Sequence, residues 1–343
     1  MKNKIVNDEK ISVFGKISRK IKDFFYDLSV KRASKKPVKP VSIKSNNFNR
    51  KVFYYSMVAI PFLHYLIFYI GVNFNSILLA FKEMKLVNDI VVTDWGGFIN
   101  FTTFFNNFIF GTELKNMLVN SLIYYFVGLI VGVPCALIFS YYIYKKYFFS
   151  EFFRVILFFP SMISSVVTVF MYKYLIDYGV VEFVGLFNVE IMPPTGEPIY
   201  MRSIVIFFNI MMGFGVNILM YSSAMTRIPI SVVEYAALDG VRPFREFLTI
   251  TIPLIFDTIS TFLIVGVSGI FINQVNLYAM YDRFAGSNIS TLGYHLYVLT
   301  VHDTDGVNYP YAAAMGLIFT VIAVPITFGA RWFFGEINPD VQY

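Results

Sequence analysis

Two groups of uncharged polar residues lie within long apolar stretches and are the first candidates for chemistry. The groups are Asn209, Gly213 and Asn217 at i, i+4 and i+8, and Gly266, Gly269 and Asn273 at i, i+3 and i+7. Each spacing puts the group on one face of a helix. Lipid offers amides no hydrogen-bond partner, so such faces meet other helices or an aqueous path. The faces therefore either pack helices together or line a path for a neutral polar solute. A sugar would suit such a path, because amides bind hydroxyl groups.

A charged insert separates these two stretches. Residues 234–253 read E-Y-A-A-L-D-G-V-R-P-F-R-E-F-L-T-I-T-I-P. The run S-V-V-E from Ser231 to Glu234 predicts a capping box, in which the serine hydroxyl starts a short helix. Gly240 would end that helix, and Pro243 suits the first turn of a second helix that runs to the end of the insert. A charged helix–turn–helix this short cannot cross a bilayer, so we expect it outside the membrane, exposed to a partner.

The remaining chain has the composition of a membrane protein. Hydrophobic residues make up 57%, charged residues 15%, and the mean hydropathy is +0.61. At about 1.5 Å rise per residue, six stretches are long enough to span a bilayer. They are 52–81, 116–144, 152–176, 203–226, 253–279 and 309–332. We therefore predict an all-α integral membrane protein with six transmembrane helices.

The distribution of basic residues predicts the orientation. The segments 1–51, 145–154 and 227–247, with the tail from Arg331, hold 22 of the 28 Lys and Arg residues. Basic residues concentrate on the cytoplasmic side of membrane proteins. Both termini and the charged insert are therefore expected in the cytoplasm.

Three regions follow from this layout. The first is a cytoplasmic segment, 1–51, whose basic amphipathic pattern suits an anionic membrane surface rather than nucleic acid. The second is a six-helix transmembrane domain, 52–335, which carries the cytoplasmic loop 227–253. The third is a cytoplasmic tail, 336–343. The first apolar run begins near Val52, too late for a cleavable signal peptide.

Signals of catalysis are missing from the sequence. It has no G-x-x-x-x-G-K-[ST] run that would bind a nucleotide. The three histidines show no metal-ligand spacing, and the single Cys135 lies among apolar neighbours. We therefore expect a chain that is not an enzyme and that holds no cofactor or metal itself.

The charged insert resembles the EAA loop of binding-protein-dependent ABC importer permeases, in the maltose-transporter family of sugar permeases. The positions that match the family's pattern are Glu234, Ala236, Asp239, Gly240, Phe247, Ile250 and Pro253. Tyr235 replaces the usual first alanine, and Ile252 stands where leucine is common. The resemblance extends over roughly 52–335, including the six-span layout.

The resemblance implies a type I importer permease with several partners. A second permease subunit would complete the pathway, most simply as a heterodimer. Two ATP-binding subunits would bind ATP and Mg²⁺ below it, and an extracytoplasmic solute-binding protein would deliver the substrate. The implied location is the bacterial cytoplasmic membrane, crossed several times.

The resemblance also implies roles for individual residues. Contact with the ATPase is expected for Glu234, Ala236, Ala237, Asp239, Gly240, Arg242, Arg245 and Phe247. The substrate pathway is expected to include Asn209, Gly213, Asn217, Gly269 and Asn273. One departure is the run Arg283-Phe284-Ala285-Gly286, where sugar permeases often show a G-G-P-like element.

Other functions remain open at this point. Within the importer class, the substrate could instead be a polyol, a glycerophosphate-like compound or another small solute. A secondary carrier that works without ATP would need ionisable residues at mid-membrane or internal inverted repeats, and neither is apparent. A membrane enzyme would need catalytic acids or histidines clustered near one interface, and no such cluster is apparent.

Overall fold

The computed structural model describes residue 26 and residues 43–88 and 90–337. The amphipathic pattern predicted within 1–51 and most of the tail 336–343 therefore lie outside the described residues, and the three predicted regions stay predictions. The chain divides into two compact units, Met1–Val72 and Asn73–Tyr343. In the first unit, helix α2 (Ile43–His64) continues through a π-helical turn, η1 (Tyr65–Ile70). The helix α3 (Gly71–Leu79) follows and extends into the second unit.

The second unit begins with an antiparallel hairpin of β1 (Lys82–Val87) and β2 (Ile90–Trp95). The helices of its first half are α4 (Ile99–Phe110), α5 (Glu113–Val127), η2 (Gly128–Gly132), α6 (Val133–Tyr144), α7 (Ser150–Met162), α8 (Ser165–Tyr174), η3 (Leu175–Val180), α9 (Val181–Gly185) and η4 (Pro194–Gly196). Those of its second half are α10 (Pro198–Met225), α11 (Ile230–Leu238), α12 (Pro243–Glu246), η5 (Phe247–Thr251), α13 (Ile252–Leu254), α14 (Phe256–Gly269), α15 (Leu277–Tyr281), α16 (Leu292–Val301) and α17 (Tyr309–Ile337).

The apolar segments predicted from the sequence are present as helices. Four are long and apolar enough to cross a membrane: Arg50–Leu79, Glu113–Tyr144, Pro198–Met225 and Tyr309–Ile337. Two further segments are pairs of helices with a bend between them, and counting each pair once gives six spans. The pairs are Ser150–Met162 with Ser165–Gly185, and Pro243–Leu254 with Phe256–Gly269.

The third predicted span, 152–176, is therefore not one straight helix. The helix axis bends by 104° between its two halves. Ile163 and Ser164 adopt extended backbone between them. Pro160 lacks an N–H group for the helix ladder, and serines compete with helical hydrogen bonds, which explains a break at this place.

The fifth predicted span, 253–279, also differs from the structure. The helix α14 ends at Gly269, and an irregular segment follows in which Val275 and Asn276 have positive φ angles of 45° and 56°. The Asn273 side chain accepts a hydrogen bond from the Val275 N–H at 2.9 Å. Side-chain bonds of this kind compete with the helix backbone and end it early.

The insert forms the predicted helix–turn–helix with one correction. The turn is as predicted, since Gly240 has a φ of 69° and Pro243 occupies the first turn of α12. The capping box is wrong: α11 begins at Ile230 after Pro229, and no side chain caps it. The second helix ends at Leu254, one residue after the predicted end at Pro253, and a bend of 68° separates it from α14.

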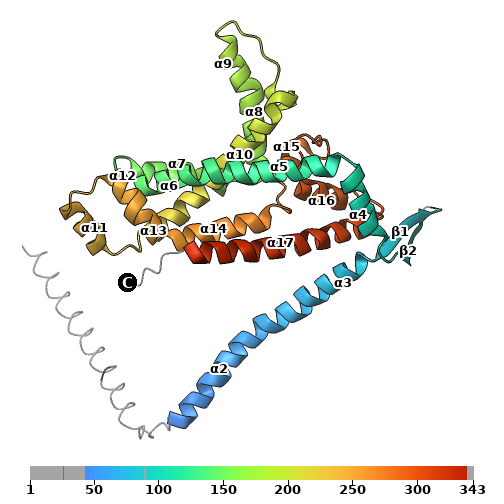
Figure 1. The fold of residues 1–343 in the computed structure, drawn as a ribbon, viewed down its shortest axis with the longest axis horizontal. Coiled ribbons are helices and arrows are strands. Elements are labelled where there is room, and N and C mark those ends of the chain that lie inside the picture. Colours follow the sequence, from blue (N-terminus) through green and yellow to red (C-terminus); the bar gives the residue numbers. More distant parts are fainter. Residues whose placement is uncertain (1–25, 27–42, 89, 338–343) are drawn as a thin grey trace, which may run out of the picture. The chain divides into compact units, whose positions relative to one another are not determined.

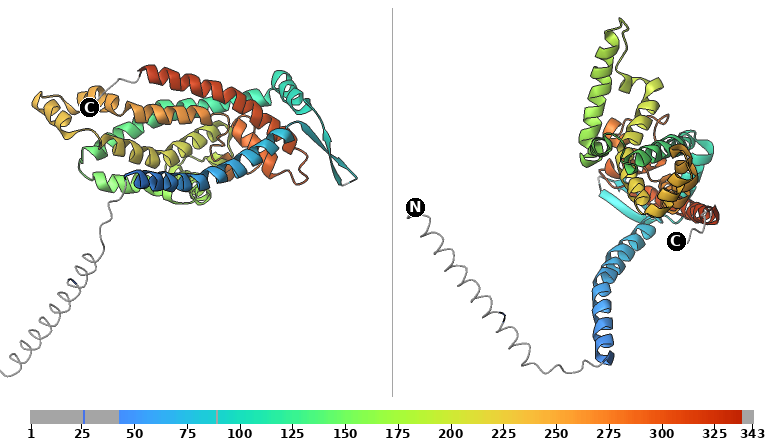
Figure 2. Two further views of the ribbon diagram at one scale, coloured as in Figure 1. Left: turned by 90° about the horizontal axis from the view of Figure 1, so that it is seen from below. Right: turned by 90° about the vertical axis from the view of Figure 1, so that its left-hand side faces the viewer.

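Helix packing within the second unit places α10 at its centre. Figure 1 shows α10 crossing α6 and α7, and Figure 2 shows α14 alongside α17. A side-chain carbon on Gly215 of α10 would lie 2.4 Å from the Leu157 carbonyl oxygen of α7, so only glycine permits this close approach. Buried residues of α6, α10 and α14 form one core cluster, which also contains Phe247 of the insert.

Candidate substrate cavity and coupling insert

A cavity of about 360 Å³ lies between α5, α10, α14 and the irregular segment that follows α14. All five residues predicted to line the pathway border it: Asn209, Gly213, Asn217, Gly269 and Asn273. Gly266, which the sequence placed on the same face as Gly269, borders it too. The structure thus brings the two predicted faces together around one space.

The lining of this cavity is mainly apolar, with several polar groups and no charged side chain among the described residues. Its side chains include three amides, but no Asp, Glu, Lys, Arg or His is among the described residues that border it. Its aromatic rings are Tyr124, Tyr125, Phe214, Tyr221 and Phe262. Amides and hydroxyls can exchange hydrogen bonds with a neutral solute, and the rings offer flat apolar surfaces to it.

Asn209 holds the cavity wall together. Its amide nitrogen donates to the carbonyl oxygens of Val205 at 2.9 Å and Val275 at 2.8 Å. Its amide oxygen accepts a hydrogen bond from Asn276 at 3.1 Å. Asn217, two turns further along α10, forms no side-chain hydrogen bond with any described residue. Asn209 therefore serves the packing role considered from the sequence, while Asn217 remains available to a solute.

The segment 287–290, which directly precedes the cavity residue Thr291, is fixed from α5. Asn120, which is 2% exposed, donates to the carbonyl oxygens of Ser287 at 2.9 Å and Ser290 at 3.0 Å. The Tyr124 hydroxyl donates to the Ile289 carbonyl at 3.0 Å. Sequence reasoning missed Asn120, although a buried amide inside a predicted span was a signal that could have found it.

Arg202, at the start of α10, binds the same segment, and we call the side chains of Asn120, Tyr124 and Arg202 the clamp on residues 287–290. Its guanidinium donates to the carbonyl oxygen of Asn288 at 2.7 Å and to the side-chain oxygen of Asn120 at 2.9 Å. A cation held by two acceptors is strongly positioned. Nothing in the neighbourhood of Arg202 along the chain points to these partners.

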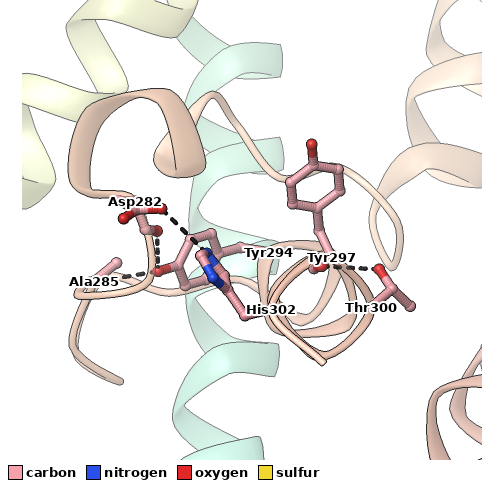
Figure 3. A network of polar contacts seen from close by, with 6 residues as sticks. All are labelled: Asp282, Ala285, Tyr294, Tyr297, Thr300 and His302. Atoms are coloured by element: carbon pink, nitrogen blue, oxygen red, sulfur yellow. Dashed lines mark hydrogen bonds and ion pairs between the residues drawn. The ribbon is translucent and has the colours of Figure 1, made fainter. Parts of the chain in front are cut away.

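Beyond the wall, a polar network orders the stretch that leads into α16 (Figure 3). The Tyr294 hydroxyl donates to the Asp282 carbonyl at 2.6 Å and accepts from the Ala285 N–H at 3.2 Å. His302 lies 3.2 Å from the Asp282 carboxylate. Burial raises the pKa of Tyr294, so its hydroxyl stays protonated and keeps donating. The Thr291 side chain caps α16 by accepting from the Tyr294 N–H.

The predicted coupling residues divide into an exposed and a buried set. The exposed set is Glu234, Ala237, Asp239, Gly240, Arg242 and Arg245. Ala236 and Phe247 are 5% and 6% exposed and pack within the protein. Three large apolar side chains that the sequence did not single out stand out from the same surface: Tyr235, Leu238 and Phe244. The insert thus presents both charges and apolar side chains to the outside.

The insert is tied firmly to the end of α6. Lys145 and Glu246 form an ion pair at 2.6 Å, and Glu246 is buried. The Tyr141 hydroxyl donates to the Pro243 carbonyl at 3.1 Å, and the rings of Tyr141 and Phe247 are 5.0 Å apart. These contacts make the insert a rigid extension of the helices above it.

The cavity and the surface-exposed charged insert occur in a chain whose sequence matches a known family. Residues 128–343 match the model of the family described as "Binding-protein-dependent transport system inner membrane component". The chain belongs to this family. It is therefore a multi-pass membrane permease of a binding-protein-dependent ABC transport system, as the resemblance of the insert predicted.

Individual relatives agree with this assignment. The chain is 25% identical to Protein LplB of Bacillus subtilis, over 80% of this chain and 86% of the relative. It is 24% identical to the sn-glycerol-3-phosphate transport system permease protein UgpA of Salmonella typhi, over 67% and 77%. It is 23% identical to the galactooligosaccharides transport system permease protein GanP of Bacillus subtilis, over 76% and 64%.

The fold is also found among solved structures. A bacterial ABC transporter involved in the import of the acidic polysaccharide alginate matches with a TM-score of 0.70 at 21% identity. The match covers 85% of this chain and 98% of the other. The bacterial alginate ABC transporter in complex with an alginate pentasaccharide-bound periplasmic protein matches with a TM-score of 0.69. The fold is therefore that of a type I importer permease.

Proposed function

We propose that this chain is the permease subunit of an ATP-driven importer for a neutral sugar or oligosaccharide. The observation that carries the proposal is the cavity of about 360 Å³, in which amides, hydroxyls and aromatic rings occur without any charged side chain. A volume of this size falls in the range of pockets that bind small molecules. A sugar hydroxyl can both donate to and accept from an amide, and Asn217 offers both groups.

In the proposed assembly, the energy comes from partner chains. Two ATP-binding subunits would hold ATP and Mg²⁺ and dock on the insert 234–253, while this chain would catalyse no reaction. A second permease, most simply a related chain, would form the other half of the pathway. An extracytoplasmic solute-binding protein would deliver the sugar, and both termini and the insert would face the cytoplasm of a bacterial cell.

The exposed surface of the insert supports this docking. Glu234, Arg242 and Arg245 can form ion pairs with a partner, and exposed Leu238 and Phe244 can bury apolar area against it. The rigid link from Lys145 to Glu246 would transmit a displacement of the insert to α6, which packs against α10 beside the cavity.

A second candidate substrate is a phosphorylated polyol, because UgpA is named for sn-glycerol-3-phosphate. Phosphate recognition normally uses Arg, Lys or helix N-termini. No charged residue in the described part of the chain borders the cavity, and the Arg202 guanidinium is already bonded to Asn120 and Asn288. The geometry therefore favours a neutral solute.

The test is reconstitution of the chain with the subunits that co-purify with it. We expect a co-purifying ATPase and solute-binding protein, with ATP hydrolysis stimulated by a neutral sugar loaded on that binding protein. Asn217→Leu should reduce uptake into vesicles while basal hydrolysis stays unchanged. Stimulation by a sugar phosphate alone would replace the neutral-sugar proposal with the second candidate.

A further inference from the structure

The helix α14 has a second face that the central cavity does not use. Leu263 and Gly266 border the cavity, whereas Ile264 and Ser268 border a separate groove of about 460 Å³ between α14 and α17. Figure 2 shows these two helices side by side. One helix therefore separates the proposed sugar site from a groove on the outer surface of the second unit.

The surface of the groove is apolar, although several hydroxyl groups border it. The hydroxyl of Ser268 donates to the Val265 carbonyl at 2.7 Å. Thr320 and Thr327 donate in the same way to carbonyl oxygens of their own helix, at 2.8 and 2.7 Å. With their donors satisfied, these side chains add mainly hydrocarbon to a wall that already contains Phe319 and Phe328.

Among the described residues, Arg331 is the one charged residue that borders this groove, at one end. It is exposed, and it forms no hydrogen bond or ion pair with any described residue. Asp257 and Glu336 are the acidic residues of α14 and α17, and neither forms an ion pair with it. Trp332, next along the chain, is 70% exposed. Arginine beside exposed tryptophan is typical of the level at which lipid headgroups lie.

The length of the groove matches one leaflet of a bilayer. Twelve residues separate Phe319 from Arg331 on α17. At a rise of about 1.5 Å per residue they cover about 18 Å. Half of a hydrocarbon core of about 30 Å is about 15 Å. An acyl chain that starts beside Arg331 would therefore end near Phe319.

We propose that the groove between α14 and α17 binds an anionic phospholipid, with one acyl chain in the groove and the phosphate on Arg331. A basic pocket between transmembrane helices is a recognised way to bind anionic headgroups. A partner helix would suit the groove less well. An apolar helix packed there would leave the charge of Arg331 unpaired, whereas a phosphate group neutralises it.

Occupancy of the groove would affect transport through α14. A lipid packed against Ile264 and Ser268 limits how far this helix can move away from the cavity, which it borders through Leu263 and Gly266. We therefore expect uptake to depend on anionic lipid. That dependence rests on the proposed importer function, whereas lipid binding does not.

The test measures lipids retained by the transporter purified with its partner subunits. The complex is equilibrated with equal amounts of phosphatidylglycerol and phosphatidylcholine and studied by native mass spectrometry. The wild-type complex should retain phosphatidylglycerol preferentially. Arg331→Gln should lower that retention about fivefold, the effect of one cation near a headgroup. Arg331→Lys should retain most of it.

Two further variants separate this site from general lipid adhesion. Ala323→Trp fills the groove and should reduce retention with the charge intact, whereas Arg154→Gln removes an exposed arginine elsewhere and should have no effect. Unchanged retention in both Arg331→Gln and Ala323→Trp would overturn the proposal.

Discussion

Lys145 and Glu246 join the end of α6 to the insert through an ion pair of 2.6 Å, and their side chains are only 19% and 9% exposed. Removing one partner of a buried pair leaves the other charge without compensation, which costs about 3 kcal/mol. We predict that Lys145→Met lowers the thermal stability of the purified complex and uncouples ATP hydrolysis from substrate. The double variant Lys145→Met/Glu246→Gln should recover much of the stability. If the double variant is as unstable as the single one, the unpaired charge of Glu246 is not the cause of the lower stability.

Two glycines of α10 should respond differently to the same substitution. A side-chain carbon at Gly215 would lie 2.4 Å from the Leu157 carbonyl oxygen, whereas at Gly213 the nearest atom is the Asn217 amide nitrogen at 3.9 Å. Gly215→Ala should therefore force α7 and α10 apart and reduce the yield of folded protein. Gly213→Ala should fold normally and only narrow the cavity. Yield and melting temperature in detergent measure the difference, and equal behaviour of the two variants would contradict the close packing.

Substitutions of Asn209 and Asn217 should distinguish a structural role from a role in transport. Two hydrogen bonds of Asn209 fix Val275 and Asn276, so Asn209→Leu should destabilise the protein by about 1 kcal/mol for each buried group left unpaired. Asn217→Leu should leave the melting temperature unchanged and reduce uptake. A transporter with normal uptake after Asn217→Leu would show that this amide does not contact the solute.

Gly240 should tolerate asparagine better than leucine. Its φ of 69° is a left-handed conformation, which costs an ordinary residue about 1 kcal/mol or more, and asparagine adopts it most readily after glycine. No atom lies within 4 Å of a side-chain carbon built there, so size alone gives no clash inside this chain. We predict that Gly240→Leu abolishes ATPase co-purification and that Gly240→Asn largely preserves it. Charge reversal in Glu234→Lys should also weaken the association.

His295 should make the stability depend on pH. Burial lowers the pKa of His295 below its ordinary value of 6.5, although Glu113 opposes the shift. The unfolded chain then binds a proton that the folded chain resists, so stability falls as the pH drops below about 6.5. We predict that His295→Asn flattens the melting temperature between pH 7 and pH 5. A variant with the same slope as the wild type would assign the effect to another group.

The sequence predicted the features that depend on local pattern. Long apolar runs located the four long helices and the two bent helix pairs, because the length needed to cross a bilayer is fixed. The spacing of Asn209, Gly213 and Asn217 put them on one face, and Gly240 and Pro243 placed the turn of the insert. Each of these follows from backbone geometry over a few residues.

The features that the sequence missed depend on contacts between distant segments. The break after Gly269 is held by Asn209, more than sixty positions earlier, and by the Asn273 side chain. The clamp of Asn120 and Arg202 on the segment 287–290 joins three parts of the chain. The Lys145–Glu246 pair crosses a hundred residues. Bonds between residues so far apart leave no helical or strand periodicity in the sequence.

The clamp on the segment 287–290 has one more consequence. Asn120, Tyr124 and Arg202 all bind backbone carbonyl oxygens of this segment, and a carbonyl is the same whichever side chain its residue carries. The segment can therefore keep its backbone path while its own side chains change. Thr291, which follows it directly and borders the cavity, would stay in place through such substitutions.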